Sequence, residues 1–197
     1  RRVALCDLDP QASLTVFCGA APSTTPLEAA ATAVLEGACL YAGGVALSNA
    51  APDAVAAHVE RARQDADVVL VDLRGTLDDA GHTERLLRCP GVTVLAVPAA
   101  EPRSGPELVK LIARAQAAGV AVRVLINRVA RTAPSRRVLD AYRTRLGAMV
   151  LAAAIPERVD VQRAEERRVP VTVDAPHGAV AVALRAAAAQ LVEEGIA

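Results

Sequence analysis

Residues 3–15 read VALCDLDPQASLT, an apolar run followed at once by two carboxylates and a proline. Val3 to Cys6 predicts a short buried strand, and the sequence Asp7-Leu8-Asp9-Pro10 ends it, because proline has no N–H to continue the pairing. The strand therefore presents Asp7 and Asp9 at its carboxyl end. In α/β proteins ligands bind at that edge of the sheet, so this stretch indicates a fold and a site together.

Strands and helices alternate along most of the chain. We expect further strands at residues 45–47, 67–71, 92–97, 120–126 and 149–153, and helices at residues 26–38, 53–63, 79–89, 107–118, 135–146 and 177–194. The strand at 67–71 reads DVVLV, a continuous apolar run typical of a strand covered on both faces of a parallel sheet. The alternation predicts a doubly wound α/β fold, with a mostly parallel sheet flanked by helices. We expect residues 1–197 to form a single domain.

The amino-acid composition excludes several classes of protein. The chain has 197 residues, of which 53% are apolar, so it can bury one sizeable core. Its 22 basic and 22 acidic side chains cancel, which argues against a generally basic nucleic-acid binder but allows a local arginine patch. The four cysteines contain no C-x-x-C pair and the three histidines are isolated, so neither a zinc site nor a redox pair is indicated. Without an apolar run of membrane length or a signal peptide, we expect a cytoplasmic protein that does not bind membranes.

Residues 4–15 resemble the deviant Walker motif of the ParA/MinD/Soj family of partition ATPases, in which a strand delivers a DLDPQ segment beside bound ATP. The resemblance implies a P-loop NTPase-like fold of the SIMIBI class, with ATP and Mg²⁺ as cofactors. It implies that Asp9 is catalytic and orients the attacking water, and that Asp7 lies near the Mg²⁺ and the phosphates. Both roles suit carboxylates, since Mg²⁺ takes oxygen ligands and a hydrolytic water needs an acceptor. The alternative is a polar turn that caps a strand. For Ser13 and Thr15 we expect helix N-capping.

Residues 67–72 are similar to the family's Walker B strand, whose terminal aspartate reaches Mg²⁺ through water. The resemblance therefore implies that Asp72 is a nucleotide-site and metal-site residue. A turn-forming aspartate after a buried strand is the alternative. Relatives usually continue with Asp-Thr-Pro-Pro where residues 72–75 read Asp-Leu-Arg-Gly, so the loop geometry and the hydrolysis rate stay open.

Two positions in the second half resemble the family's base-binding edge. Asn127 ends the predicted strand at 120–126, and its carboxamide offers both a donor and an acceptor to adenine. A loop asparagine that bonds its own backbone is the alternative. Pro156, in the Ile155-Pro156 pair, is the second cofactor-binding position implied by the resemblance.

Residues 155–171 resemble the stretch from which partition ATPases bind DNA without sequence preference. The implied contacts are Arg158, Arg163, Arg167 and Arg168, with Arg136 and Arg137 as further members of the patch. Phosphate contacts of this kind make binding strongly salt-dependent. Acidic residues are interleaved with these arginines, so a solvated mixed-charge face is the alternative.

The resemblance also implies a homodimer that sandwiches ATP, nonspecific DNA and a ParB-like centromere-binding protein as partners, and association with the nucleoid. The family's K-G-G-V-G-K-T-type loop does not occur in the sequence. In relatives it precedes the DLDPQ strand by one βα unit of roughly thirty residues, so we expect it ahead of Arg1 and regard the domain as N-terminally truncated. The alternatives are a nucleotide-free pseudo-ATPase that acts as a binding module, a MinD-like positioning ATPase and an amide-forming synthetase. The short acidic tail at 190–197 disfavours MinD-like membrane binding, which uses a basic amphipathic helix.

Overall fold

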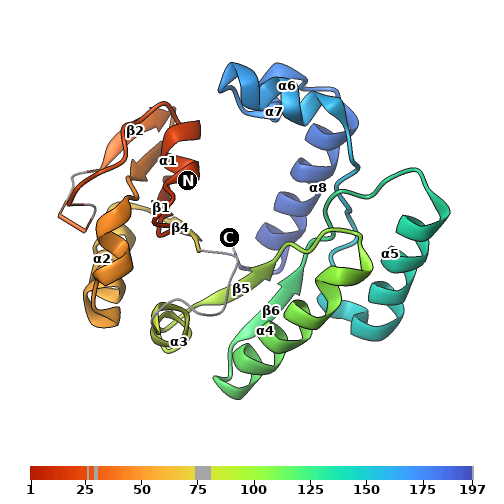
Figure 1. The fold of residues 1–197 in the computed structure, drawn as a ribbon, viewed down its shortest axis with the longest axis horizontal. Coiled ribbons are helices and arrows are strands. Elements are labelled where there is room, and N and C mark those ends of the chain that lie inside the picture. The colour runs from red at the N-terminus through yellow and green to blue at the C-terminus, as the bar shows by residue number, and fades with distance from the viewer. Residues whose placement is uncertain (26, 29–30, 74–80, 197) are drawn as a thin grey trace. The chain divides into compact units, whose positions relative to one another are not determined.

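The computed structural model describes residues 1–25, 27–28, 31–73 and 81–196. The chain divides into two compact units, Arg1–Pro90 (unit 1) and Gly91–Ala197 (unit 2), coloured red to yellow-green and green to blue in Figure 1. Parallel strands with helices packed on them occur in both units, so the predicted α/β class is confirmed. The expectation of a single domain over residues 1–197 stays a prediction.

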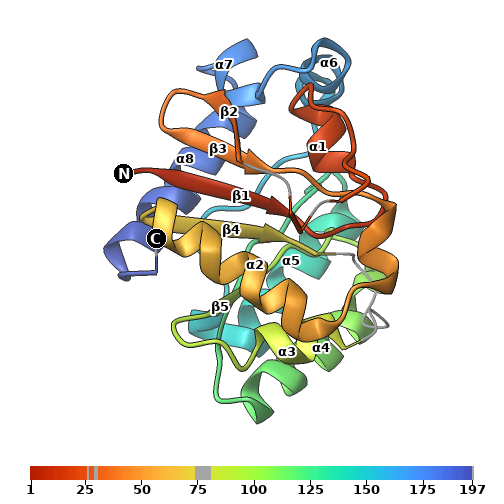
Figure 2. The same ribbon diagram turned by 90° about the vertical axis from the view of Figure 1, so that its left-hand side faces the viewer.

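Unit 1 contains a four-stranded sheet in the order β2-β3-β1-β4. Its strands are β1 (Val3–Asp7), β2 (Thr32–Leu35), β3 (Ala38–Tyr41) and β4 (Val68–Asp72). β1 lies between β3 and β4 and runs parallel to both, as Figure 2 shows. The register pairs Asp7 of β1 with Asp72 of β4, so the two carboxylates leave the sheet at the same edge.

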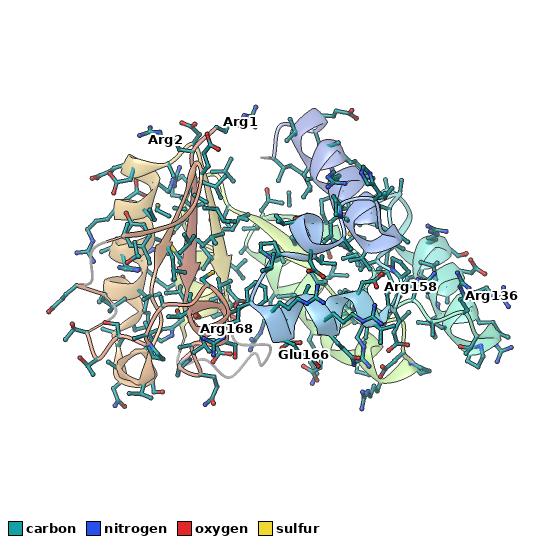
Figure 3. The ribbon with its side chains drawn as sticks, turned by 90° about the horizontal axis from the view of Figure 1, so that it is seen from above. Arg1, Arg2, Arg136, Arg158, Glu166 and Arg168 are labelled. Carbon is teal, nitrogen blue, oxygen red and sulfur yellow. The ribbon has the colours of Figure 1, made fainter. Side chains whose placement is uncertain are left out.

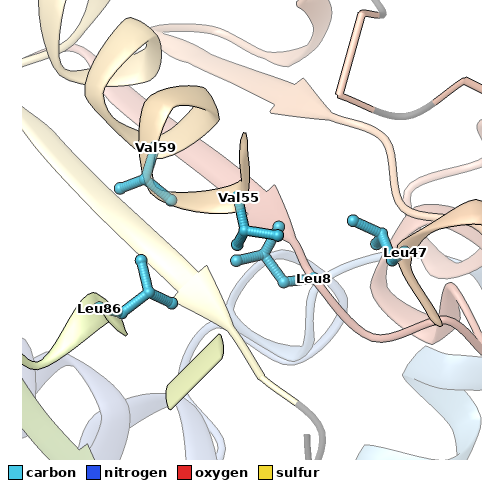
Figure 4. Close-up of a cluster of buried hydrophobic side chains, with 5 residues drawn as sticks. All are labelled: Leu8, Leu47, Val55, Val59 and Leu86. Atoms are coloured by element: carbon cyan, nitrogen blue, oxygen red, sulfur yellow. The ribbon is translucent and has the colours of Figure 1, made fainter. Parts of the chain in front are cut away.

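The helices of unit 1 are α1 (Ser13–Phe17), the 3-10 helix η1 (Val45–Asn49), α2 (Pro52–Asp65) and α3 (His82–Leu86). α2 packs against β1 and β4. Five buried side chains converge between η1, α2, α3 and the end of β1 (Figure 4): Leu8, Leu47, Val55, Val59 and Leu86. Burial of a leucine contributes about 1.5–3 kcal/mol. Because Leu8 lies between Asp7 and Asp9, this core anchors the turn that carries the two carboxylates.

The helix predicted at residues 26–38 is wrong. The described part of that segment contains β2 and the start of β3, joined by the two-residue turn Glu36-Gly37. Gly37 has φ +74°, a conformation that suits a tight hairpin turn and breaks a helix. β3 then pairs in parallel with β1. Tertiary pairing therefore outweighs the helix propensity of this alanine-rich segment.

The short strand predicted at residues 45–47 is also wrong, since these residues begin the 3-10 helix η1. η1 buries Leu47 in the core described above, whereas Val45 is exposed. The strand predicted at 67–71 is confirmed as β4. β4 is the last strand in the order of the unit 1 sheet, and Leu70 is 51% exposed. The described residues of unit 1 therefore do not cover this strand completely.

Unit 2 has two parallel strands, β5 (Thr93–Ala96) and β6 (Ala121–Val124). Its helices are η2 (Pro102–Ser104), α4 (Gly105–Ala117), α5 (Ala133–Leu146), η3 (Gly147–Met149), α6 (Val159–Arg167), α7 (Val171–Asp174) and α8 (Ala179–Glu193). The core contains Leu125, Leu151, Ile155, Val180 and Ala187.

The strand predicted at 149–153 is reduced to a single parallel bridge between Val124 and Val150. Residues 147–149 form the 3-10 helix η3, and the N–H of Ala152 donates to Oε1 of Gln190 on α8 at 2.9 Å, so no regular ladder continues. The other predicted elements of this unit are confirmed, with shifted ends. In unit 1, α3 lies inside the predicted 79–89 helix, of which residues 79–80 fall outside the described chain.

Candidate functional site

Asp7 accepts three hydrogen bonds within the predicted site. It is 1% exposed. Its Oδ2 accepts from the N–H of Thr15 at 2.8 Å and from the hydroxyl of Thr15 at 2.7 Å, while its Oδ1 accepts from the N–H of Asp9 at 3.1 Å. A buried carboxylate that receives several hydrogen bonds is held firmly in one position. Asp7 therefore ties the end of β1 to α1 and to the turn at Asp9.

The turn between β1 and α1 is closed by its own backbone. The N–H of Ala12 donates to the carbonyl of Asp9 at 2.8 Å, and Oδ1 of Asp9 accepts from the N–H of Gln11 at 2.9 Å. Ala12 precedes α1 in the left-handed region with φ 53° and offers no side-chain cap. The N–H of Thr15 in the first turn donates to Oδ2 of Asp7 instead. The expectation that Ser13 and Thr15 cap this helix is wrong, because the Thr15 hydroxyl reaches back to Asp7.

Two glycines that follow β3 complete this network, and the sequence reasoning missed them. The N–H of Gly43 donates to Oγ1 of Thr15 at 2.8 Å. A Cβ on Gly43 would lie 2.7 Å from Cγ of Asp7, and a Cβ on Gly44 would lie 1.9 Å from the carbonyl oxygen of Ser23. Both positions exclude any side chain. The consecutive glycines were the available signal, since glycine often marks a close approach of backbones.

Asp72 lies beside Asp7 in the register of β1 and β4, and its carbonyl accepts from the N–H of Leu8 at 2.9 Å. Although its surface is exposed, partial desolvation raises the pKa of Asp72, and the carboxylates of Asp7 and Asp9 raise this pKa further. The structure therefore brings the three predicted aspartates of unit 1 together. Arg74 and Gly75, which complete the altered loop, lie outside the described residues.

The three aspartates fit Mg²⁺ by their chemistry, since the ion takes oxygen ligands and its charge would offset the repulsion that raises the pKa of Asp72. Among the described residues, no group of three or more His, Cys, Asp or Glu side chains has the geometry to hold a metal directly. Contact of Asp72 with Mg²⁺ through water stays a prediction.

Asn127 and Pro156 lie on neighbouring segments of unit 2. The N–H of Asn127 donates to the carbonyl of Pro98, and Val129 forms a parallel bridge with Pro156. Oδ1 of Asn127 accepts from the N–H of Arg128 at 2.8 Å. This is the local backbone bond that a loop asparagine makes by itself, so contact with adenine stays a prediction.

The predicted DNA-binding arginines lie before, on and after α6, and two of them are engaged within the protein. Arg158 donates to the carbonyl of Glu157 at 3.0 Å, and Arg167 pairs with Asp174 at 2.8 Å. Arg163 and Arg168 are exposed. Figure 3 labels Arg158, Arg168 and the acidic neighbour Glu166 on this stretch. The surface around α6 is thus of mixed charge.

A denser group of arginines belongs to α5 and the loop before it. Residues 128–145 contain six arginines and one acidic residue, Asp140. On α5 itself, Arg136, Arg137, Arg143 and Arg145 are all exposed, and Figure 3 shows Arg136 projecting outward from the helix. In the described part of the chain, none of these four has an ion-pair partner; Arg143 donates to the carbonyl of Ala152. We call these four residues the α5 arginines.

Unit 1 combines parallel strands with an Asp-Leu-Asp turn at the carboxyl end of β1, the edge at which α/β folds bind ligands. The family model described as the CobQ/CobB/MinD/ParA nucleotide binding domain matches residues 1–171, and the chain belongs to this family. This confirms the resemblance noted in the sequence. No curated protein matches the chain by sequence.

Solved structures of the same fold include partition and positioning ATPases. A plasmid partition protein of Borrelia burgdorferi B31 bound to AMPPNP has a TM-score of 0.80 at 15% identity and covers 98% of this chain and 87% of its own. The septum site-determining protein MinD of Pyrococcus horikoshii with Mg-ADP has a TM-score of 0.76 at 18% identity, with coverage of 97% and 83%. The Cyanothece McdA complex with ATP has a TM-score of 0.72 at 14% identity, with coverage of 94% and 84%. At these identities the likeness shows the fold. No helix in the described ranges is long and apolar enough to cross a membrane.

Proposed function

We propose that the protein is a ParA-type ATPase that acts in plasmid or chromosome partition. The observation that carries this proposal is the Asp7–Asp9 turn, which is fixed by buried hydrogen bonds and has Asp72 in register beside it. Family membership and the nucleotides named for the solved relatives support ATP as the ligand.

In this proposal each aspartate has a separate task. Asp9 accepts a proton from the attacking water and orients it, because its turn lies at the ligand edge of the sheet. Asp72 holds the hydration shell of Mg²⁺, and Asp7 supports this edge from its buried position. Mg²⁺, when bound, supplies the charge that stabilises the phosphates. Asn127 and Pro156 are proposed to contact the base.

The test is ATP hydrolysis by the purified full-length protein, with any residues that its gene encodes ahead of Arg1, in the presence of Mg²⁺ and compared with the Asp9→Asn variant. We expect Asp9→Asn to lower kcat about 100-fold or more, since it removes the acceptor for the water's proton. Glu193→Gln, which removes an exposed carboxylate at the end of α8, is the matched control and should leave kcat unchanged. Nucleotide binding without hydrolysis, or no nucleotide binding in the unsubstituted protein, would favour the pseudo-ATPase alternative.

We further propose that the protein forms an ATP-dependent homodimer, binds DNA without sequence preference, associates with the nucleoid and is stimulated by a ParB-like partner. Arg158, Arg163, Arg167 and Arg168 remain the family-based candidates for DNA contact. The α5 arginines have stronger support from charge, because residues 128–145 hold six arginines and a single acidic residue. Around α6, four acidic residues are interleaved with the arginines and Arg167 is paired with Asp174. A change of all four α5 arginines to alanine should weaken DNA binding more than the matched change of the four around α6.

If an arginine variant binds DNA more weakly, the salt dependence of binding shows whether phosphate contacts were lost or the protein is partly unfolded. Each lost phosphate contact should reduce the slope of log affinity against log salt by about 0.9. Equal affinities for the α5 variant and the unsubstituted protein would remove α5 from the interface. No DNA binding at any salt concentration would remove this part of the proposed function and leave the ATPase part standing.

A MinD-like positioning ATPase is the second candidate, favoured by the structural likeness to MinD. Binding to vesicles with anionic lipids distinguishes the two candidates. The partition protein should bind DNA and not the vesicles, whereas the MinD-like protein should show the reverse.

A further inference from the structure

The Thr15 side chain is fully buried, and its hydroxyl makes two hydrogen bonds in the network of unit 1. The hydroxyl donates to Oδ2 of Asp7 at 2.7 Å and accepts from the N–H of Gly43 at 2.8 Å. It is thus both a donor and an acceptor, a combination that a hydroxyl supplies and a methyl group does not. Thr15 therefore joins the loop after β3 to the carboxylate at the end of β1.

The Asp7 carboxylate links Thr15 to Asp9 by hydrogen bonds. Its Oδ2 receives the hydroxyl and the N–H of Thr15, and its Oδ1 receives the N–H of Asp9. A carboxylate offers about four acceptor positions, so three are already occupied by protein donors. Asp7 is consequently better suited to fix the turn than to bind a ligand. Asp9, whose Oδ1 faces the short turn at Gln11, is the more accessible of the two carboxylates.

We propose that Thr15 is a positioning residue, which holds the Asp9 carboxylate for water activation by way of Asp7, with the Gly43 loop as its support. This inference rests on the proposed ATPase function and deepens it. Asp7 then serves as the anchor of the turn, while Asp9 and Asp72 face the nucleotide and Mg²⁺. Any movement of the loop at Gly43 is transmitted to Asp9, because the connecting groups are buried and hydrogen-bonded.

The experiment compares three variants of the purified protein in ATP hydrolysis with Mg²⁺. Thr15→Val keeps the shape and the backbone N–H but removes both bonds of the hydroxyl, whereas Thr15→Ser keeps the hydroxyl. Leu108→Ala, a buried change on α4 of unit 2, is the control for general loss of stability. We expect Thr15→Val to lower kcat about 10- to 100-fold, as misplacement of a catalytic group does. KM should change by less than about threefold, and Thr15→Ser should keep kcat within about threefold of the unsubstituted protein.

Hydrogen exchange gives a readout that does not depend on turnover. The amides of Gly43 and Asp9 should exchange about tenfold faster or more in Thr15→Val, because the acceptor of Gly43 is gone and that of Asp9 is less well fixed. They should stay protected in Thr15→Ser and in Leu108→Ala.

Three results would overturn the inference. An unchanged kcat in Thr15→Val would show that Asp9 does not depend on the hydroxyl. An equal loss of kcat in Thr15→Ser would show that the packing of the threonine methyl matters instead. An unsubstituted protein without hydrolysis would remove the proposed function and the positioning role together, and fast exchange at Gly43 in Thr15→Val would then identify Thr15 as a purely structural bond.

Discussion

The two units of the chain differ in how their charges are used. Unit 1 holds 7 basic and 12 acidic side chains, whereas unit 2 holds 15 basic and 10 acidic ones. In unit 1 the Asp7 carboxylate is buried and accepts hydrogen bonds from three protein donors. In unit 2 the α5 arginines stand exposed on a helix surface. Charges that are held in place suit chemistry at fixed atoms, while exposed charges suit contact with a large, variable partner. The net charge of zero for the whole chain is therefore the sum of an acidic unit 1 and a basic unit 2.

The largest effect that would test this contrast is expected at Gly44. A Cβ there would lie 1.9 Å from the carbonyl oxygen of Ser23, a backbone atom that cannot turn away. We expect Gly44→Ala to lower the free energy of unfolding by about 3 kcal/mol or more, as overpacking of a rigid site does. Chemical denaturation followed by circular dichroism measures the change.

Gly119 in unit 2 is the matched control for Gly44. It has φ +72° and no atom within 4 Å of an added Cβ, so Gly119→Ala meets only backbone strain. We expect a loss of about 1 kcal/mol there. Equal losses for the two alanine variants would show that the loop after β3 is not rigid, which would weaken the proposed support of Thr15.

A second prediction compares the two cores. Leu8 and Leu151 are buried in unit 1 and unit 2 respectively, and each change to alanine should cost about 2–5 kcal/mol. If residues 1–197 form a single cooperative domain, both variants should lower one common unfolding transition. If each variant lowers a transition of its own, the single-domain prediction is wrong.

The smallest effect concerns Asp72. Its folded-state pKa is raised, so folding favours the protonated form and this side chain opposes folding once the pH rises above the ordinary aspartate pKa of 3.8. We expect Asp72→Asn to raise the melting temperature by about 1–2 °C at pH 7, a modest value because the side chain is exposed. The difference should disappear as the pH falls below 3.8.

Melting temperatures measured with and without Mg²⁺ test the role of Asp72 further. The ion should raise the melting temperature of the unsubstituted protein and have little effect on Asp72→Asn, because the carboxylate that orders its hydration shell is gone. A melting temperature that is lower in Asp72→Asn at pH 7 would show that Asp72 stabilises unit 1 by contacts other than charge.

The sequence predicted much of the candidate site, because the strand ends and the acidic turn follow from patterns of neighbouring residues. The apolar run before Asp7 and the run before Asp72 predicted parallel strands, and their register brings these two residues to one edge. The Asp-Leu-Asp-Pro-Gln stretch identified the family, which the match over residues 1–171 confirms. The arginines proposed to contact DNA, around α6 and on α5, stay a prediction.

The sequence by itself therefore determined the alternation of elements, the family and the place of the three aspartates at the strand ends. Hydrophobic periodicity and local turn chemistry depend only on residues near one another in the chain. Only the tertiary structure decided the rest. Residues 32–41 form a hairpin because β3 pairs with β1, and helix propensity carries no information about this pairing. Thr15 became a partner of Asp7 through a bond across 8 positions, and Gly43 joined them from 28 positions beyond Thr15. Contacts over such distances depend on packing of the whole unit, and no local pattern encodes them.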